Sequence, residues 1–138
     1  MIEYDKFQKA LKHLELQQEN YQNLDPSLPA LMQEAVAESV IQRFETTYDC
    51  MWKVLKRYLI EEMGIPDMPN SPKPIFRIAA ENKLLSSNIE EWLKYADTRV
   101  ATAHDYSGEK AKDCLEIMGA FIDDAIGLYQ TMTKETWE

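Results

Sequence analysis

Residues 36–63 read VAESVIQRFETTYDCMWKVLKRYLIEEM. Their apolar side chains recur nearly every fourth residue, as on one face of an α-helix: Val36, Val40, Phe44, Tyr48, Trp52, Leu55 and Leu59. The pattern predicts a helix of about 35 residues, which is long for a globular domain. We expect it to begin after the turn-rich segment 25–29, with Ser27 as its N-cap, and to end at Gly64 and Pro66.

Three further long helices are predicted around this one. The first carries its apolar residues at Tyr4, Phe7, Leu11 and Leu14. A capping box, Ser87-Asn88-Ile89-Glu90, starts the next helix, whose apolar residues are Ile89, Trp92, Leu93, Ala96 and Val100. After a turn around Asp105–Ser107, the last helix is expected to bury Ala111, Leu115, Met118, Ile122, Ala125 and Tyr129.

Residues 64–74, GIPDMPNSPKP, form a proline-rich loop, and a short helix from about Ile75 to Lys83 follows it. The chain has 138 residues, only four glycines and many good helix formers. We therefore expect one domain over residues 1–138, with an all-α fold. Short connections between long helices favour an antiparallel (up-and-down) four-helix bundle with an additional short helix.

Composition narrows the classes of function. No stretch approaches the roughly 20 apolar residues that cross a bilayer, and the N-terminus lacks the apolar core of a signal peptide. We therefore expect a cytoplasmic protein without a membrane partner, in which Cys50 and Cys114 are reduced core residues. The net charge of −9 argues against broad coating of nucleic acid, although a local basic groove or a basic protein partner remains compatible.

The segment Arg99-Val100-Ala101-Thr102-Ala103-His104-Asp105-Tyr106 is the candidate for chemistry. Histidine transfers protons near neutral pH and arginine binds phosphate. Together, Arg99 and His104 would suit RNA cleavage without metal, the histidine moving the proton of a 2′-hydroxyl. Their spacing on an ideal helix places them about 140° apart, so convergence needs a loosened helix or two paired protomers. The alternative is that a helix C-terminus simply attracts Arg and His through its dipole.

Other residues have plainer interpretations. His13 is expected to face solvent on the first helix. Lys53, Lys56 and Arg57, with Arg77, could line a phosphate-binding groove or form a solvated face beside the apolar stripe. The aromatic residues Trp52 and Trp92 fit core anchors better than base-stacking platforms. The sequence lacks a glycine-rich phosphate loop and a Cys/His cluster, so neither a metal nor a cofactor is expected.

Several stretches resemble one family within the HEPN superfamily, that of nucleotidyltransferase substrate-binding proteins. Arg99-x4-His104-x-Tyr106 resembles its R-x4-H-x-Y motif. The resemblance extends from about residue 35 to 130 and includes Gln42–Tyr48, Trp52-Lys53-x-x-Lys56, Pro72-x-Pro74, Phe76-Arg77, Ala79-Ala80 and Trp92-Leu93. One position departs from the pattern, because Val100 stands where the motif usually has a polar residue, commonly Asn.

This resemblance implies a homodimeric helical protein that works with a minimal nucleotidyltransferase (MNT) supplied as a separate chain. In its toxin–antitoxin form, the HEPN protein is a metal-independent ribonuclease with RNA as substrate. By that analogy Arg99 and His104 are catalytic, and the partner transfers AMP to Tyr106. In the alternative form, the same surface belongs to a non-catalytic subunit that binds a substrate or nucleotide. A third interpretation, an unrelated helical interaction domain, does not depend on the resemblance.

Overall fold

The computed structural model describes residues 1–103 and 108–138, and all regular structure within these ranges is helical. Five helices follow one another along the chain: α1 (Asp5–Gln22), α2 (Ala30–Glu61), α3 (Pro72–Glu81), α4 (Ile89–Thr102) and α5 (Gly108–Thr133). The all-α prediction is confirmed for these residues, with four long helices and one short one.

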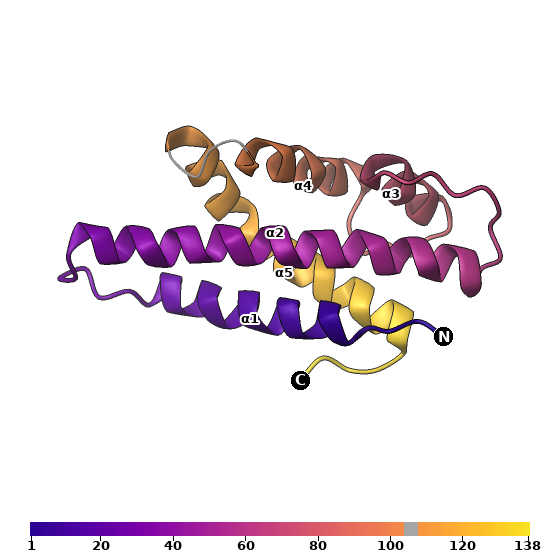
Figure 1. Ribbon diagram of the computed structural model, residues 1–138, viewed down its shortest axis with the longest axis horizontal. Coiled ribbons are helices and arrows are strands. Elements are labelled where there is room, and N and C mark those ends of the chain that lie inside the picture. The colour runs from indigo at the N-terminus through magenta and orange to yellow at the C-terminus, as the bar shows by residue number, and fades with distance from the viewer. Residues whose placement is uncertain (104–107) are drawn as a thin grey trace.

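The long helix α2 is the central element of the fold (Figure 1). Helices α1 and α4 lie along opposite sides of α2 and run antiparallel to it, whereas α5 passes behind α2 at an angle (Figure 1). The short helix α3 lies beyond the start of α4 and packs on α2 and α4. Because α5 also packs on α1, α2 and α4, it closes the core from behind.

The core stripe of α2 differs from the predicted one at Trp52. Repeated steps of four residues rotate the stripe by about 40° each, so it drifts away from the core unless a step of three intervenes. The structure takes that step between Tyr48 and Met51, which are both buried, while Trp52 is only half-buried. The prediction that Trp52 is a core anchor is therefore wrong in part, and Met51 occupies the core position.

Six aromatic rings form a closed circuit in the core, each next to the following one. Their centroids are separated by 4.8–6.0 Å, with several pairs edge to face, an arrangement that aromatic rings favour. In order around the circuit they are Phe44, Tyr48, Phe76, Trp92, Tyr95 and Phe121. The circuit draws on α2, α3, α4 and α5, and it confirms Trp92 as a core anchor.

Two predicted helix starts are corrected by the structure. The N-cap of α2 is Pro29, not Ser27. The Ser27 amide and hydroxyl both donate to Asp25 Oδ1, at 2.9 and 2.8 Å, so Ser27 belongs to the preceding turn. The N-cap of α4 is Asn88, whose Oδ1 accepts from the Glu91 amide at 3.3 Å, one residue later than the predicted capping box.

The ends of α2 and α3 also shift from the predicted bounds. Helix α2 ends at Glu61, and Gly64 adopts a φ of 67°, as expected of a glycine after a helix. Helix α3 begins at Pro72, three residues before the predicted start, and ends at Glu81 rather than at Lys83. A proline is well tolerated in the first helical turn, because the amides there lack intrahelical partners.

On α4, the apolar residues do not all face the core, since 63% of Val100 is exposed. Tyr95 is buried instead, and its hydroxyl donates to Asp124 Oδ2 of α5 at 2.5 Å. The other oxygen of Asp124 accepts hydrogen bonds from Ser86 and Ser87 at 3.1 and 2.6 Å. The serine that was expected to cap α4 thus ties the α3–α4 connection to α5.

Three smaller predictions can be assessed in the described residues. His13 is exposed, as expected. Cys50 and Cys114 are both free; Cys114 is buried and Cys50 is partly buried. Among the helices in the described ranges, none is both long and apolar enough to cross a bilayer.

Candidate functional site

Arg99 is fixed by two acidic side chains of α2. Its Nε and Nη2 donate to the two oxygens of Asp49, at 3.2 and 3.1 Å, which is the bidentate geometry that a planar guanidinium favours. Its Nη1 donates to Glu45 Oε2 at 3.1 Å. These hydrogen bonds orient the guanidinium, and the two carboxylates offset its charge.

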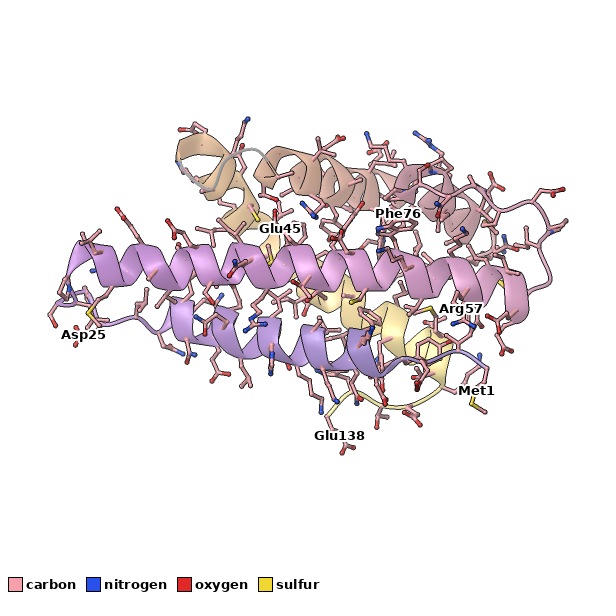
Figure 2. The ribbon with its side chains drawn as sticks, viewed as in Figure 1. Met1, Asp25, Glu45, Arg57, Phe76 and Glu138 are labelled. Carbon is pink, nitrogen blue, oxygen red and sulfur yellow. The ribbon has the colours of Figure 1, made fainter. Side chains whose placement is uncertain are left out.

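The secondary structure explains why these residues meet. Glu45 and Asp49 are four residues apart, so they lie on one face of α2. Figure 2 shows Glu45 on the side of α2 that faces α4. Arg99 lies in the last turn of α4, and Thr102 of the same turn donates its hydroxyl hydrogen to Glu45 Oε2 at 2.9 Å. Glu45 therefore joins two residues of α4 to α2.

Exposure differs between the two carboxylates. The Glu45 side chain is 14% exposed, the Asp49 side chain is 42% exposed, and Arg99 is intermediate at 26%. A screened pair contributes little to stability, whereas a charge that is mostly removed from water depends strongly on its partner. Glu45 is therefore the structural anchor of Arg99, and Asp49 is the partner that a ligand can replace more readily.

A cleft of about 790 Å³ opens beside Arg99, between α2, α4 and the start of α3; we call it the α2–α4 cleft. Its walls combine aromatic, proline and charged side chains. They are Tyr48, Asp49, Trp52, Ser71, Pro72, Lys73, Pro74, Ala96, Asp97, Arg99 and Val100. A volume of this size is in the range of small-molecule sites.

Lys73 is the second cation of the cleft, and its Nζ lies 2.6 Å from Asp97 Oδ1. Both partners are substantially exposed, so this pair contributes little to stability. Tyr48 lines the same cleft, and burial raises the pKa of its phenol, with the nearby Asp49 adding to the shift. Tyr48 consequently remains a neutral phenol at physiological pH.

Cys114 of α5 is buried near Glu45. Burial raises the pKa of the Cys114 thiol to about 12, and the charge of Glu45 acts in the same direction. A thiol with such a pKa is protonated at neutral pH and is a poor nucleophile. Cys114 is therefore a packing residue of this region.

The other predicted basic residues lie elsewhere. Lys53 is exposed, with its Nζ 5.9 Å from the centroid of the Trp52 ring, and Lys56 donates to Asn70 Oδ1 at 3.0 Å. Arg57 pairs with Glu61 near the N-terminus (Figure 2), and Arg77 is exposed on α3. None of these four is among the described residues that line the cleft, so the structure does not assemble them around Arg99.

Sequence reasoning overlooked Lys73, Glu45 and Asp49. Lys73 stands within Pro72-x-Pro74, a segment that resembles the family, but its own charge was not considered. The i, i+4 spacing of Glu45 and Asp49 indicated a shared helix face. No local pattern indicated that Arg99 would meet that face.

His104 and Tyr106, predicted as catalytic and modified residues, lie outside the described residues. The last residue of α4 is Thr102, with Ala103 as its C-cap. In residues 1–103 and 108–138, no group of three or more His, Cys, Asp or Glu side chains is placed to hold a metal ion.

The helical fold and the Arg99 motif define a HEPN-like helical protein. The chain belongs to the family described as nucleotidyltransferase substrate binding protein like, whose model matches residues 2–134. It is 32% identical over 85 residues to a Haemophilus influenzae protein named probable ribonuclease HepT. That alignment covers 60% of this chain and 58% of the relative, so it spans little more than half of either protein.

Two solved structures share the fold. One is a protein from Thermus thermophilus with a TM-score of 0.73 and 28% identity, covering 90% of this chain and 98% of the other. The other, from Haemophilus influenzae, is described as revealing the fold of a substrate binding domain of a nucleotidyltransferase. It has a TM-score of 0.85 and 24% identity, and the match covers 94% of this chain and 98% of that one. At this identity the second likeness concerns the fold alone.

Proposed function

We propose that this chain is the HEPN component of a two-chain MNT–HEPN pair and acts as a metal-independent endoribonuclease, with Arg99 and His104 as its catalytic residues. One observation carries the proposal: Arg99, the first residue of the R-x4-H-x-Y motif, is held in a fixed orientation beside a cleft. The relative named probable ribonuclease HepT supports the same activity, and family membership supports a nucleotidyltransferase as the partner.

The proposed reaction is transesterification within the RNA strand. His104 accepts the proton of the 2′-hydroxyl, the 2′-oxygen attacks the adjacent phosphorus, and the bond to the 5′-oxygen breaks as that oxygen takes up a proton. Arg99 stabilises the extra negative charge on the pentacoordinate phosphate. The products are a 2′,3′-cyclic phosphate and a 5′-hydroxyl, so neither a metal nor a cofactor is consumed.

The contacts of Arg99 suggest how it would engage a phosphate. Two oxygens of a phosphate have the right spacing to accept the two hydrogen bonds that Arg99 Nε and Nη2 donate to Asp49. Asp49 is the more exposed partner, so phosphate displaces it while Glu45 keeps the guanidinium in place. In this proposal the protein is a homodimer, and the two sites lie close enough for each protomer to supply a proton-transfer group.

Regulation is proposed to act at Tyr106. The separate nucleotidyltransferase transfers AMP to the phenol oxygen of Tyr106 and thereby silences the ribonuclease. Tyr106 is two residues from His104 in the sequence, so an added phosphate there would place negative charge beside the proposed active site and repel RNA.

A second candidate function is a non-catalytic subunit that binds a nucleotide or acceptor for the nucleotidyltransferase. Two observations favour it: Arg99 already faces two carboxylates, and the chain has a net charge of −9. Both features weaken the attraction of RNA. The family description as substrate binding fits this candidate as well.

The deciding experiment is cleavage of a mixed RNA pool in the presence of EDTA by three purified proteins: the wild type, His104→Ala and His13→Ala. His13 is an exposed histidine on α1 and provides a matched control. We expect the wild type and His13→Ala to cleave and His104→Ala to be inactive. Equal cleavage by all three would point to a contaminating nuclease. Absence of cleavage by a wild type whose intact mass shows no added AMP would favour the binding subunit.

A further inference from the structure

The lining of the α2–α4 cleft combines charged side chains with aromatic and proline rings. Asp49 and the guanidinium of Arg99 are among the charged groups. Trp52 lies three residues further along α2, about 4.5 Å along the helix axis and on nearly the same face. The start of α3 lines the same cleft as Trp52. A ligand of nucleotide size can therefore touch both the cation and the indole ring.

The start of α3 contributes two proline rings to the wall, with Lys73 between them. A helix N-terminus usually attracts phosphate through its first free amides. In α3, however, Pro72 and Pro74 occupy the first and third positions and have no amide hydrogen. Of the first three residues only Lys73 retains an amide. Two pyrrolidine rings beside a half-buried indole suit the face of an aromatic ring better than an anion.

We propose that the α2–α4 cleft binds a nucleobase against Trp52, Pro72 and Pro74, with the attached phosphate at Arg99. This inference rests on the proposed function and specifies its substrate: the base must be unpaired, since only a base outside a duplex can enter such a cleft. The same chemistry has two sources, a nucleotide within single-stranded RNA or a free nucleotide. Stacking on an aromatic ring tolerates every base, so sequence preference at this position is weak.

The balance of charges in the cleft indicates that the base must contribute to binding affinity. Arg99 and Lys73 are paired with Asp49 and Asp97, so the four charged side chains of the wall balance. A polyanion is not drawn strongly to a neutral surface. We therefore expect affinity to depend on the base and to fall only modestly with salt, as for one or two phosphate contacts.

The test measures binding without cleavage. The probe is a fluorescein-labelled six-residue 2′-O-methyl oligoadenylate, which lacks the 2′-hydroxyl nucleophile, and its binding is followed by fluorescence anisotropy. We expect Trp52→Ala to weaken binding about ten-fold and Trp52→Phe to retain most of it. Lys9→Ala, an exposed change on α1 that is not among the cleft-lining residues, should alter binding less than two-fold. An abasic strand of equal length should bind as weakly to the wild type as the oligoadenylate binds to Trp52→Ala.

A second substitution covers the case that Trp52→Ala does not fold. Val100 lies on the wall and is 63% exposed, so Val100→Glu adds a charge at little structural cost. It should also weaken binding, whereas Ala120→Glu, at an exposed position on α5, should not. If neither Trp52 nor Val100 substitutions change binding, or if the abasic strand binds equally well, the inference is overturned.

Free AMP, added as a competitor, separates the two sources. Displacement of the strand by AMP, lost in Trp52→Ala, would identify a mononucleotide site. Binding of the strand without competition by AMP would identify RNA as the occupant. Either result supports a base subsite. The cleavage assay with His104→Ala is scored separately, so a failure of the ribonuclease proposal is distinguishable from a failure of this inference.

Discussion

The two carboxylates that hold Arg99 provide a matched pair of perturbations, Glu45→Gln and Asp49→Asn. Each replaces a charge by an amide of the same shape and leaves one oxygen as acceptor. Glu45 is 14% exposed and accepts from both Arg99 and Thr102. Asp49 is 42% exposed and accepts only from Arg99 in the contacts described above.

These differences set the expected magnitudes. A hydrogen bond to a charged group contributes about 1.5–3 kcal/mol when it is shielded, so we expect Glu45→Gln to lower the free energy of unfolding by about 2 kcal/mol. The exposed pair with Asp49 contributes about 0.5 kcal/mol, despite its bidentate geometry. With an unfolding entropy of about 2.1 cal/mol/K per residue, the melting temperature should fall by about 7 °C for Glu45→Gln and by about 2 °C for Asp49→Asn.

The assay is thermal and urea unfolding followed by circular dichroism, at low and at high salt. High salt should remove the effect of Asp49→Asn and leave most of the effect of Glu45→Gln, because screening acts mainly on exposed charges. Glu38→Gln, an exposed change on the same helix, is the control and should stay within about 0.5 kcal/mol. A larger loss from Asp49→Asn than from Glu45→Gln would refute the argument from burial.

Three further predictions concern the core and its titratable groups. Asp124→Ala should lower the free energy of unfolding by about 3 kcal/mol in urea denaturation, because it leaves the buried hydroxyl of Tyr95 without its acceptor on Asp124. Adding Tyr95→Phe to that variant should recover part of the loss. Burial raises the pKa of Tyr48 and of Tyr95, the latter also through its hydrogen bond to Asp124. The stabilisation that these two neutral phenols give to the folded state is therefore complete below the ordinary tyrosine pKa of 10.0 and is lost as pH rises through the folded-state pKa. The tyrosinate absorbance of these two residues should appear together with alkaline unfolding. Burial likewise raises the pKa of Cys50 and of Cys114. Both thiols should therefore react slowly with a disulfide reagent at pH 8 and rapidly in urea. In the folded protein Cys50 should react faster than Cys114, because it is only partly buried.

Local patterns were sufficient to predict the helices, because helical periodicity and turn residues are short-range signals. Long apolar stripes predicted the four long helices, and Gly64 marked the end of α2. Two of the errors arose where neighbouring residues compete for one role. Ser87 and Asn88 are both good N-caps, and Ser87 is engaged by Asp124 from a distant part of the chain. Trp52 and Met51 are both apolar, and packing against other helices selects Met51.

The candidate site was predictable only in part. The motif identified Arg99, because it depends on residues close together in the sequence. Its electrostatic environment depends instead on residues 50 and 54 positions away, and a single sequence contains no signal for that contact. A lysine between two prolines likewise carried no sign that it would face Asp97 across a cleft.

The pairing of Arg99 changes what the motif implies about affinity. An arginine identified from sequence alone suggests a positive charge that is available to attract phosphate. On that view affinity for RNA depends on net charge, and a strongly acidic chain would be a poor nuclease because it repels RNA. In the structure Arg99 faces the carboxylates of both Glu45 and Asp49, so these three side chains together carry an excess of negative charge. Binding a phosphate then exchanges one anion for another and gains little from long-range attraction. Discrimination for RNA must therefore come from contacts within reach of Arg99, and among the described residues the aromatic and proline wall of the α2–α4 cleft is the surface suited to provide them.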